Sequence, residues 1–216
     1  MRRILRPEIL DSNNSPAAEV KQSLIDLQRI NRWFGGVSTT QKLIDIVIRE
    51  TGKKELTLLD VGSATGDIPS QIANQLRIRL RYTLLDRDPT HLPAGATRVR
   101  ADALALPFCD NSFDLVTCSL FAHHLEPDQL TSFAQEALRV CRVALLINDL
   151  RRSYLHLFAI HAGAPLFGRI TRHDSVASVL RAYTPDEMRE MLNHGTARRI
   201  DIHDSYLFRM GIIAWK

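Results

Sequence analysis

The apolar residues of this chain follow two different periodicities. Up to Gly52 they recur at steps of three and four, which is the spacing of one face of a helix. The pattern predicts a helix that is capped by Ser15, has Pro16 at its first position and ends at Gly35-Gly36. A second helix is predicted over residues 39–50. On this spacing the first helix has one apolar face, made of Ala17, Val20, Leu24, Leu27, Ile30 and Phe34.

From residue 56 onward, short apolar strands alternate with helical segments. Repeated strand–helix units of this length predict an open, mostly parallel sheet with helices on both faces. The last two strands are separated by only Asp204-Ser205, so we expect them to form an antiparallel hairpin. The predicted strands are 56–61, 80–85, 97–100, 113–118, 143–147, 197–203 and 206–215, and the predicted helices are 67–76, 127–141 and 185–193.

Residues 151–184 interrupt this alternation. The segment is longer than a crossover needs and is rich in His, Phe and Arg, and we expect a helical insertion that forms a lid. After it, Thr184 and Glu187 have the spacing of a capping box at the start of the helix 185–193. The fold class predicted is α/β, with a Rossmann-like, seven-stranded, mostly parallel sheet, an antiparallel C-terminal hairpin and an N-terminal helical cap.

Composition adds little to this picture. The net charge of +4 suggests a nucleic-acid partner, but the basic residues are scattered, so we expect a solvated surface and no nucleic-acid binding. We also expect no membrane span and no signal peptide, because no apolar run is long enough. The three cysteines lack metal-ligand spacing and are expected to be free thiols, as in a reducing cytoplasm.

The stretch LLDVGSATGD, Leu58 to Asp67, joins a predicted strand to a predicted helix and contains chemistry-bearing residues. It has two glycines, Gly62 and Gly66, whereas a dinucleotide fingerprint has three, and it lacks the Gly-Lys-Ser/Thr ending of a phosphate-binding loop. Asp60 would repel a phosphate that faced it. The loop therefore favours a ligand that carries positive charge.

These residues resemble the first motif of the class I S-adenosylmethionine (SAM)-dependent methyltransferases, and the similarity extends over about residues 42–216. Asp86 follows Gly66 by 20 residues, at the place where this family has an acid for the ribose hydroxyls. RADALALPF and NSFDLVTCSLFAHHL resemble the third and fourth motifs. The cofactor-binding residues implied by the resemblance are Asp60, Gly62, Ser63, Ala64, Gly66, Asp86, Arg87, Asp102, Ala103, Ser119 and Leu120.

The resemblance implies a single methyltransferase domain that binds SAM, releases S-adenosylhomocysteine (SAH) and uses no metal. Its expected parts are a cap (1–38), a cofactor-binding core (39–150), an acceptor lid (151–184) and a closing helix and hairpin (185–216). The fourth strand ends in Cys118-Ser119, which does not supply the carboxylates of metal-dependent catechol methylation. The sequence leaves the oligomeric state open, and a homodimer is one of the alternatives.

LPFCDNSFDLV and the two histidines after it are similar to methyltransferases of small molecules, including those of quinone and polyketide pathways. RINRWFGG, INDLRRS and RHDSVASVLRAYTPDEM resemble bacterial enzymes of phenolic or polyketide secondary metabolism. The implied reaction is O-methylation of a small phenolic acceptor. C-methylation of a quinone-like ring and a non-catalytic SAM-binding scaffold remain the alternatives.

Two histidines are candidates for the general base that a phenol requires, His123 and His124, and the sequence does not choose between them. Arg152 is a candidate for fixing an acidic acceptor. Further acceptor contacts are expected from Arg32, Trp33 and His173. The Asn/Asp-Pro-Pro-Tyr/Phe box of nucleic-acid and protein amine methyltransferases is replaced by CSLF, which counts against those substrates.

Overall fold

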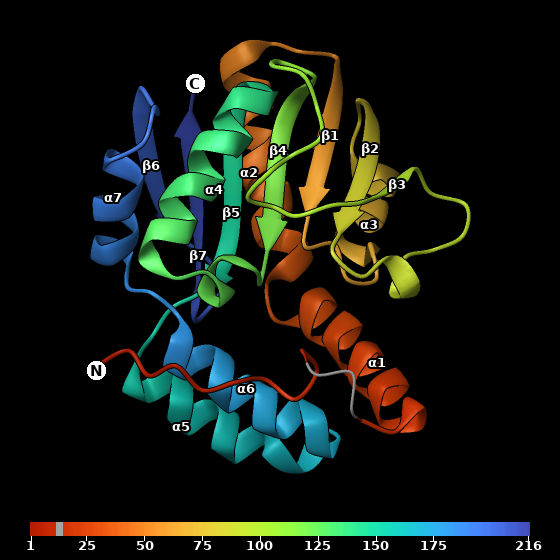
Figure 1. The fold of residues 1–216 in the computed structure, drawn as a ribbon, viewed down its shortest axis with the longest axis vertical. Helices are drawn as coiled ribbons and strands as arrows, with labels where there is room; N and C mark the ends of the chain where they lie inside the picture. The colour runs from red at the N-terminus through yellow and green to blue at the C-terminus, as the bar shows by residue number, and fades with distance from the viewer. Residues whose placement is uncertain (12–14) are drawn as a thin grey trace.

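The computed structural model describes residues 1–11 and 15–216 and contains one seven-stranded sheet (Figure 1). The strands are β1 (Glu55–Val61), β2 (Arg79–Asp86), β3 (Arg98–Arg100), β4 (Phe113–Ser119), β5 (Cys141–Leu150), β6 (Arg199–Asp204) and β7 (Arg209–Trp215). Their order is β3-β2-β1-β4-β5-β7-β6, and every neighbouring pair is parallel except those that involve β7. The predicted fold class is confirmed.

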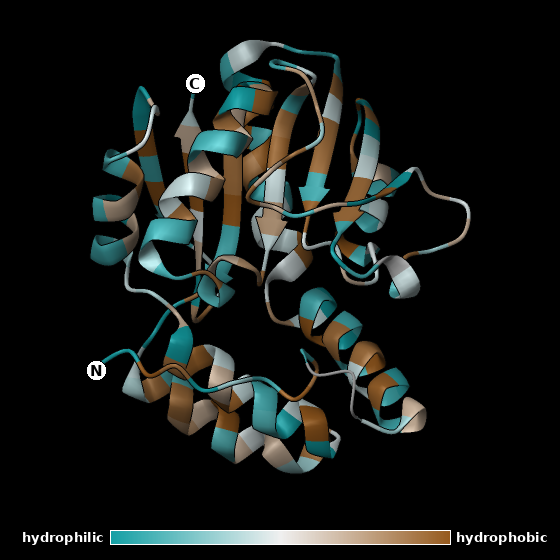
Figure 2. Ribbon diagram, viewed as in Figure 1, coloured by the Kyte–Doolittle hydropathy of each residue, from teal (hydrophilic) through white to brown (hydrophobic). Residues whose placement is uncertain are grey.

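Helices cover both faces of this sheet. They are α1 (Ala17–Trp33), α2 (Gly36–Thr51), α3 (Asp67–Gln75), α4 (Pro127–Val140), α5 (Tyr154–Gly163), α6 (Arg169–Arg181) and α7 (Pro185–Asn193), with 3₁₀ turns η1 (Pro89–His91), η2 (Ala122–His124) and η3 (Ala164–Leu166). Successive residues of β1 point to opposite faces, so Leu58 packs with α2 and α3 whereas Leu59 packs with α4 and α7. Figure 2 shows the resulting hydrophobic colour along the central strands and hydrophilic turns on the outside of α4 and α7.

A second group of helices lies at one end of the sheet. In Figure 1, α1, α5 and α6 lie together below the carboxyl ends of the parallel strands. The N-terminal strap, residues 1–11, runs along α6 and is held by backbone bonds such as Ile4 N–H to the carbonyl of Leu180 at 3.0 Å. The carboxylate of Asp174 accepts the N–H groups of Ile9 and Leu10 at 2.7 and 2.9 Å. Strap and insertion therefore form one cover over the end of the sheet.

Several local predictions are confirmed and others need correction. The capping box of Thr184 and Glu187 is present, and α5 and α6 make the insertion helical. The closing strands are antiparallel, but residues 205–208 connect them, a longer turn than predicted. The cap of α1 is Pro16, without a side-chain bond from Ser15, and α2 already begins at Gly36.

The apolar face of α1 is only partly buried. The buried residues of α1 are polar: Ser23, Asp26 and Asn31. Asp26 accepts the N–H of Gly168 and the hydroxyl of Thr171, each at 3.0 Å, so this polar face binds the insertion. No helix among the described residues is long and apolar enough to cross a membrane.

We predict that Arg152→Ala lowers the free energy of unfolding by about 2–4 kcal/mol. The buried Arg152 guanidinium donates to the carbonyls of Met1 and Ala182 at 2.9 and 2.6 Å and to Glu187 at 2.6 Å, so it joins the strap, the insertion and α7. Urea denaturation measures the loss. The neighbouring Arg151→Ala, which removes a half-exposed pair with Asp204, should change stability by less than about 1 kcal/mol; equal losses would contradict this account.

Candidate active site

A large cavity of about 1040 Å³ opens at the carboxyl ends of β1, β2 and β4. Ligands of doubly wound sheets bind at this edge, where the loops after parallel strands converge. One part, the cofactor half, is lined by the loop after β1 and the ends of β2 and β3. The other part, the acceptor half, is lined by α1, the strap, η2, the insertion and the turn between β6 and β7.

The glycines of the loop after β1 are required by its backbone. Gly62 and Gly66 have φ angles of +69° and +63°, a region that side chains disfavour. A Cβ at Gly62 would lie 2.5 Å from the ring of Phe121, and one at Gly66 would lie 2.5 Å from Leu84. Ala64 itself adopts a φ of +47°. The loop is thus held in one tight conformation between β2 and the segment after β4.

The carboxylate of Asp86 holds this loop in place. It accepts the N–H of Ala64 at 2.9 Å and the N–H of Asp88 at 3.0 Å. A carboxylate has about four acceptor sites, so two remain for a ligand in the cavity. At the end of β3, Asp102 accepts the N–H of Leu104 at 2.9 Å. Both carboxylates line the cavity with Arg87 and Ala103, and these are four of the residues that the family resemblance implies for the cofactor.

Asp60 is a buried carboxyl group at the floor of the cofactor half. Its Oδ1 accepts the hydroxyl of Thr117 at 2.8 Å, and Ser63 closes the turn by donating to the Asp60 carbonyl at 2.7 Å. Burial raises the pKa of Asp60 to about 7, although Thr117 and Ser63 oppose the shift. A cationic ligand beside this group would favour its ionised form. The site therefore suits a positively charged ligand.

His123 is a buried polar group of the acceptor half. Its Nδ1 lies 2.7 Å from Asp149 Oδ1, and its backbone N–H donates to Asp149 Oδ2 at 3.0 Å. Its Nε2 lies 3.4 Å from Glu8 Oε1, in the strap. Burial alone would favour the neutral ring, but Asp149 and then Glu8 raise the pKa of His123 to about 10. In turn, the two histidines lower the pKa of Glu8 to about 2 against the effect of burial.

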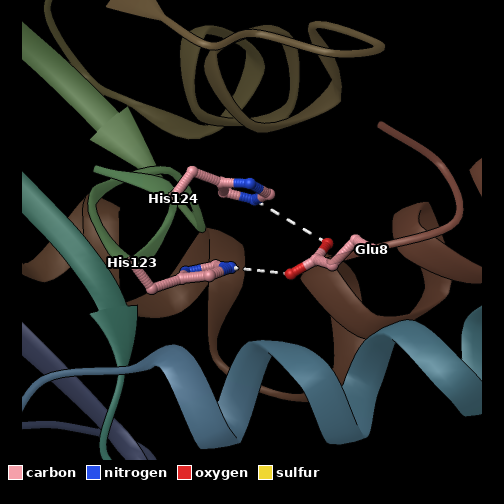
Figure 3. A group of neighbouring side chains, drawn as sticks. All are labelled: Glu8, His123 and His124. Carbon is pink, nitrogen blue, oxygen red and sulfur yellow. Dashed lines mark ion pairs between the residues drawn. The ribbon is translucent and has the colours of Figure 1, made fainter. Parts of the chain in front are cut away.

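His124 turns its ring toward the same carboxylate. Figure 3 shows both imidazoles pointing at Glu8, with dashed lines from each ring to a different oxygen. His124 Nε2 lies 3.8 Å from Glu8 Oε2, and its Nδ1 lies 3.3 Å from Asp11 Oδ2. Its side chain is about a quarter exposed, so unlike His123 it is open to the cavity.

The remaining wall of the acceptor half is mainly apolar. It includes the apolar face of α1 and side chains of the insertion and the closing turn: Leu24, Leu27, Ile30, Phe34, Ile160, Leu166, Phe167 and Phe208. Arg209 adds a buried guanidinium that donates to the carbonyl of Phe34 at 2.8 Å and whose pKa burial lowers to about 10. A flat, apolar molecule with a polar group fits this half.

Several charged groups that line the cavity were not predicted from the sequence, among them Glu8, Asp11 and Arg209. Glu8 and Asp11 come from the strap, which the fold brings over the insertion, and Arg209 is the first residue of β7. No local pattern marked these three residues.

Other predicted site residues lie elsewhere. Gly66, Arg32, Trp33, Arg152 and His173 are not among the cavity-lining residues that the structure describes. Trp33 is 60% exposed, and the Nδ1 of His173 lies 2.8 Å from Asp174. The guanidinium of Arg152 is hydrogen-bonded to Met1 of the strap and to Glu187 of α7, so we assign it a structural role. Ser63, Ser119 and Leu120, by contrast, do line the cavity.

We predict that Asp60→Asn stabilises the ligand-free chain in a pH-dependent way. The folded-state pKa of about 7 lies above the ordinary 3.8, so the stability contributed by protonated Asp60 is lost as pH rises from about 4 to 7. Asparagine cannot ionise, so the free energy of unfolding of the variant should increasingly exceed that of the parent as pH rises through this window. The difference should reach about 1–3 kcal/mol at pH 8. Urea denaturation at pH 5 and pH 8 tests this. The exposed Asp128→Asn serves as control, and a gain independent of pH would refute the explanation.

The sequence of this chain is similar to those of known methyltransferases. Residues 59–144 match the family model of the methyltransferase domain. An uncharacterized methyltransferase of Mycolicibacterium gilvum is 33% identical over 124 residues, which span 52% of this chain and 47% of that protein. A protein of Bartonella henselae named ubiquinone/menaquinone biosynthesis C-methyltransferase UbiE is 27% identical over 73% of this chain and 68% of its own. The chain thus spans from about half to two thirds of the length of these relatives.

Solved structures agree at the level of the fold. The plantazolicin methyltransferase BpumL in complex with SAH superposes with a TM-score of 0.69 at 13% identity, covering 96% of this chain and 93% of that one. A SAM-dependent methyltransferase from Aquifex aeolicus gives a TM-score of 0.59 at 16% identity, covering 89% and 96% of the two chains. Residues 59–144 are therefore similar to a methyltransferase domain, and the chain has the fold of these solved methyltransferases.

Proposed function

We propose that this chain is a SAM-dependent methyltransferase that acts on a small phenolic molecule. One observation supports this above the others: the loop of Gly62 and the paired histidines line the same cavity. A cofactor held by the first and an acceptor held by the second would meet without a barrier between them. Methyl transfer depends mainly on such alignment and on the exclusion of water.

The residues of the cofactor half fit SAM. When bound, SAM supplies a methyl group already activated on a positively charged sulfur. Asp86 has acceptor sites to spare for the two ribose hydroxyls, and the buried Asp60 suits a ligand that carries positive charge. Asp102 and Ala103 lie where an adenine would be held.

The acceptor half supports an aromatic acceptor with a hydroxyl group. The apolar face of α1 and the insertion would enclose a ring and exclude water from it. His123 and His124 would hold the hydroxyl and favour its ionised form, because both side chains line this half of the cavity. O-methylation is the reaction proposed first.

C-methylation of a quinone-like ring is the second candidate. The observation in its favour is the relative named as a ubiquinone/menaquinone C-methyltransferase, at 27% identity. An ionised ring hydroxyl makes the neighbouring ring carbon more nucleophilic, so the same histidines would serve either reaction.

We predict that the chain binds SAH and that Asp86→Ala weakens this binding at least tenfold. Loss of the carboxylate removes the acceptor for the ribose and also the bond that holds the loop at Ala64. Calorimetric titration with SAH, SAM and NAD in parallel measures it, and the exposed Asp128→Ala is the matched control. Binding of NAD alone, or undiminished SAH binding by Asp86→Ala, would overturn the cofactor assignment.

We further predict that His123→Gln and His124→Gln each lower kcat at least tenfold on the acceptor found in a screen of phenols and hydroquinones. Transfer of a labelled methyl group from SAM, followed by mass spectrometry, also separates O- from C-methylated products. His161→Gln, an exposed histidine of α5 outside the cavity, should retain full activity. SAH binding with no turnover on any member of the screen would favour a scaffold role instead.

A further inference from the structure

The three groups around Glu8 form a pattern that ion pairing alone does not explain. One ligand atom from each of Glu8, His123 and His124 lies within 4.8 Å of the others. The two Nε2–carboxylate distances, 3.4 and 3.8 Å, exceed those of good hydrogen bonds. His123 Nε2 is buried and has no hydrogen-bond partner, although it points at the carboxylate. A buried polar atom in this state requires a ligand or carries an energetic cost.

The spacing matches that of neighbouring ligands on a metal ion. Two atoms each 2.0–2.1 Å from a tetrahedral ion are roughly 3.4 Å apart. The two nitrogen–oxygen distances, 3.4 and 3.8 Å, are close to this value, and the three ligand atoms lie within 4.8 Å of one another, so the groups would have to close around an ion placed between them. Two imidazoles and one carboxylate are a donor set that suits zinc and related divalent transition ions.

The outer partners of the three groups strengthen the case. His123 Nδ1 is paired with Asp149 at 2.7 Å, and His124 Nδ1 with Asp11 at 3.3 Å. Carboxylates in this position fix the ring so that the opposite nitrogen faces the metal, and they are typical of metal-binding histidines. The third group, Glu8, accepts the hydroxyl of Ser178 at 2.7 Å. All three candidate ligands are thus held by a second set of contacts.

We propose that Glu8, His123 and His124 bind one divalent transition ion of the Zn²⁺ class at the edge of the acceptor half. No local sequence pattern marks this metal site, because Glu8 lies more than a hundred positions from the histidines and is brought beside them by the strap. All three residues line the cavity, so an acceptor can reach the remaining coordination position.

The use of the ion in catalysis rests on the proposed function. A phenolic hydroxyl that coordinates the ion would release its proton to water, and its oxygen would be held as the ionised form beside the cofactor half. The methyl group would then pass to the acceptor as its bond to sulfur breaks. Binding of the ion also joins the strap to η2, so it would close the cover over the acceptor.

The test measures metal binding and SAH binding separately on the full chain. After treatment with a chelator and dialysis, calorimetry with Zn²⁺ should give one ion per chain with micromolar or tighter affinity, whereas Mg²⁺ should bind at least a hundredfold more weakly. Co²⁺ should give the intense visible absorption of a tetrahedral site. Glu8→Gln and His124→Gln should each weaken Zn²⁺ binding at least tenfold, and Asp149→Asn about tenfold to a hundredfold through the ring of His123.

Matched controls are Glu190→Gln and His161→Gln, both exposed and outside the cavity, which should bind Zn²⁺ as the parent does. SAH affinity should stay within about twofold in every variant, which also shows that each one folds. No Zn²⁺ binding by the parent, or equal binding by Glu8→Gln and the controls, would overturn the metal site. Zn²⁺ binding by the parent without SAH binding would support the metal site while refuting the proposed methyltransferase function.

Discussion

The contact between His123 and Asp149 is the interaction on which the acceptor half depends. It joins the segment after β4 to the end of β5 through two bonds, one from the ring and one from the backbone. Both groups are buried, and removal of either partner of such a pair costs about 3–5 kcal/mol. With the ring fixed in this way, its other nitrogen faces the strap, and Arg3 of the strap donates to the carbonyls of His123 and Leu125 at 3.3 and 3.0 Å. This pair therefore contributes to the position of the strap, together with the bonds from the strap to α6 and Arg152.

The parts of the molecule that could be predicted from the sequence are those with local causes. Strand ends place Asp60, Asp86 and Asp102 at one edge of the sheet because parallel strands share their direction, and all three line the cavity. The capping box before α7 and the closing antiparallel pair follow from short-range spacing. These features depend on residues that are close together in the sequence, so they can be predicted without knowledge of the rest of the fold.

The parts that escaped prediction have long-range causes. The apolar stripe of α1 has the spacing of a core-facing helix, but Leu24, Leu27 and Phe34 line a cavity while the polar Asp26 is buried against the insertion. Periodicity shows which residues share a face and does not show whether that face meets a core or a ligand. Arg152 was assigned to chemistry for a similar reason, since its partners Met1 and Glu187 are brought to it only by the fold.

The two halves of the cavity differ in how they are built, and this has a functional consequence. The cofactor half is made of strand ends and a loop whose φ angles allow little change, so its shape is set by the sheet. The acceptor half is made of α1, the strap and the insertion, which contact one another through side chains such as Asp26 and Asp174. Substitutions in these three segments can therefore alter the acceptor without disturbing the cofactor half. Glu8 belongs to the strap, whereas His123 and His124 belong to η2. A movement of the strap away from α6 would therefore open the acceptor half and separate Glu8 from the histidines at the same time.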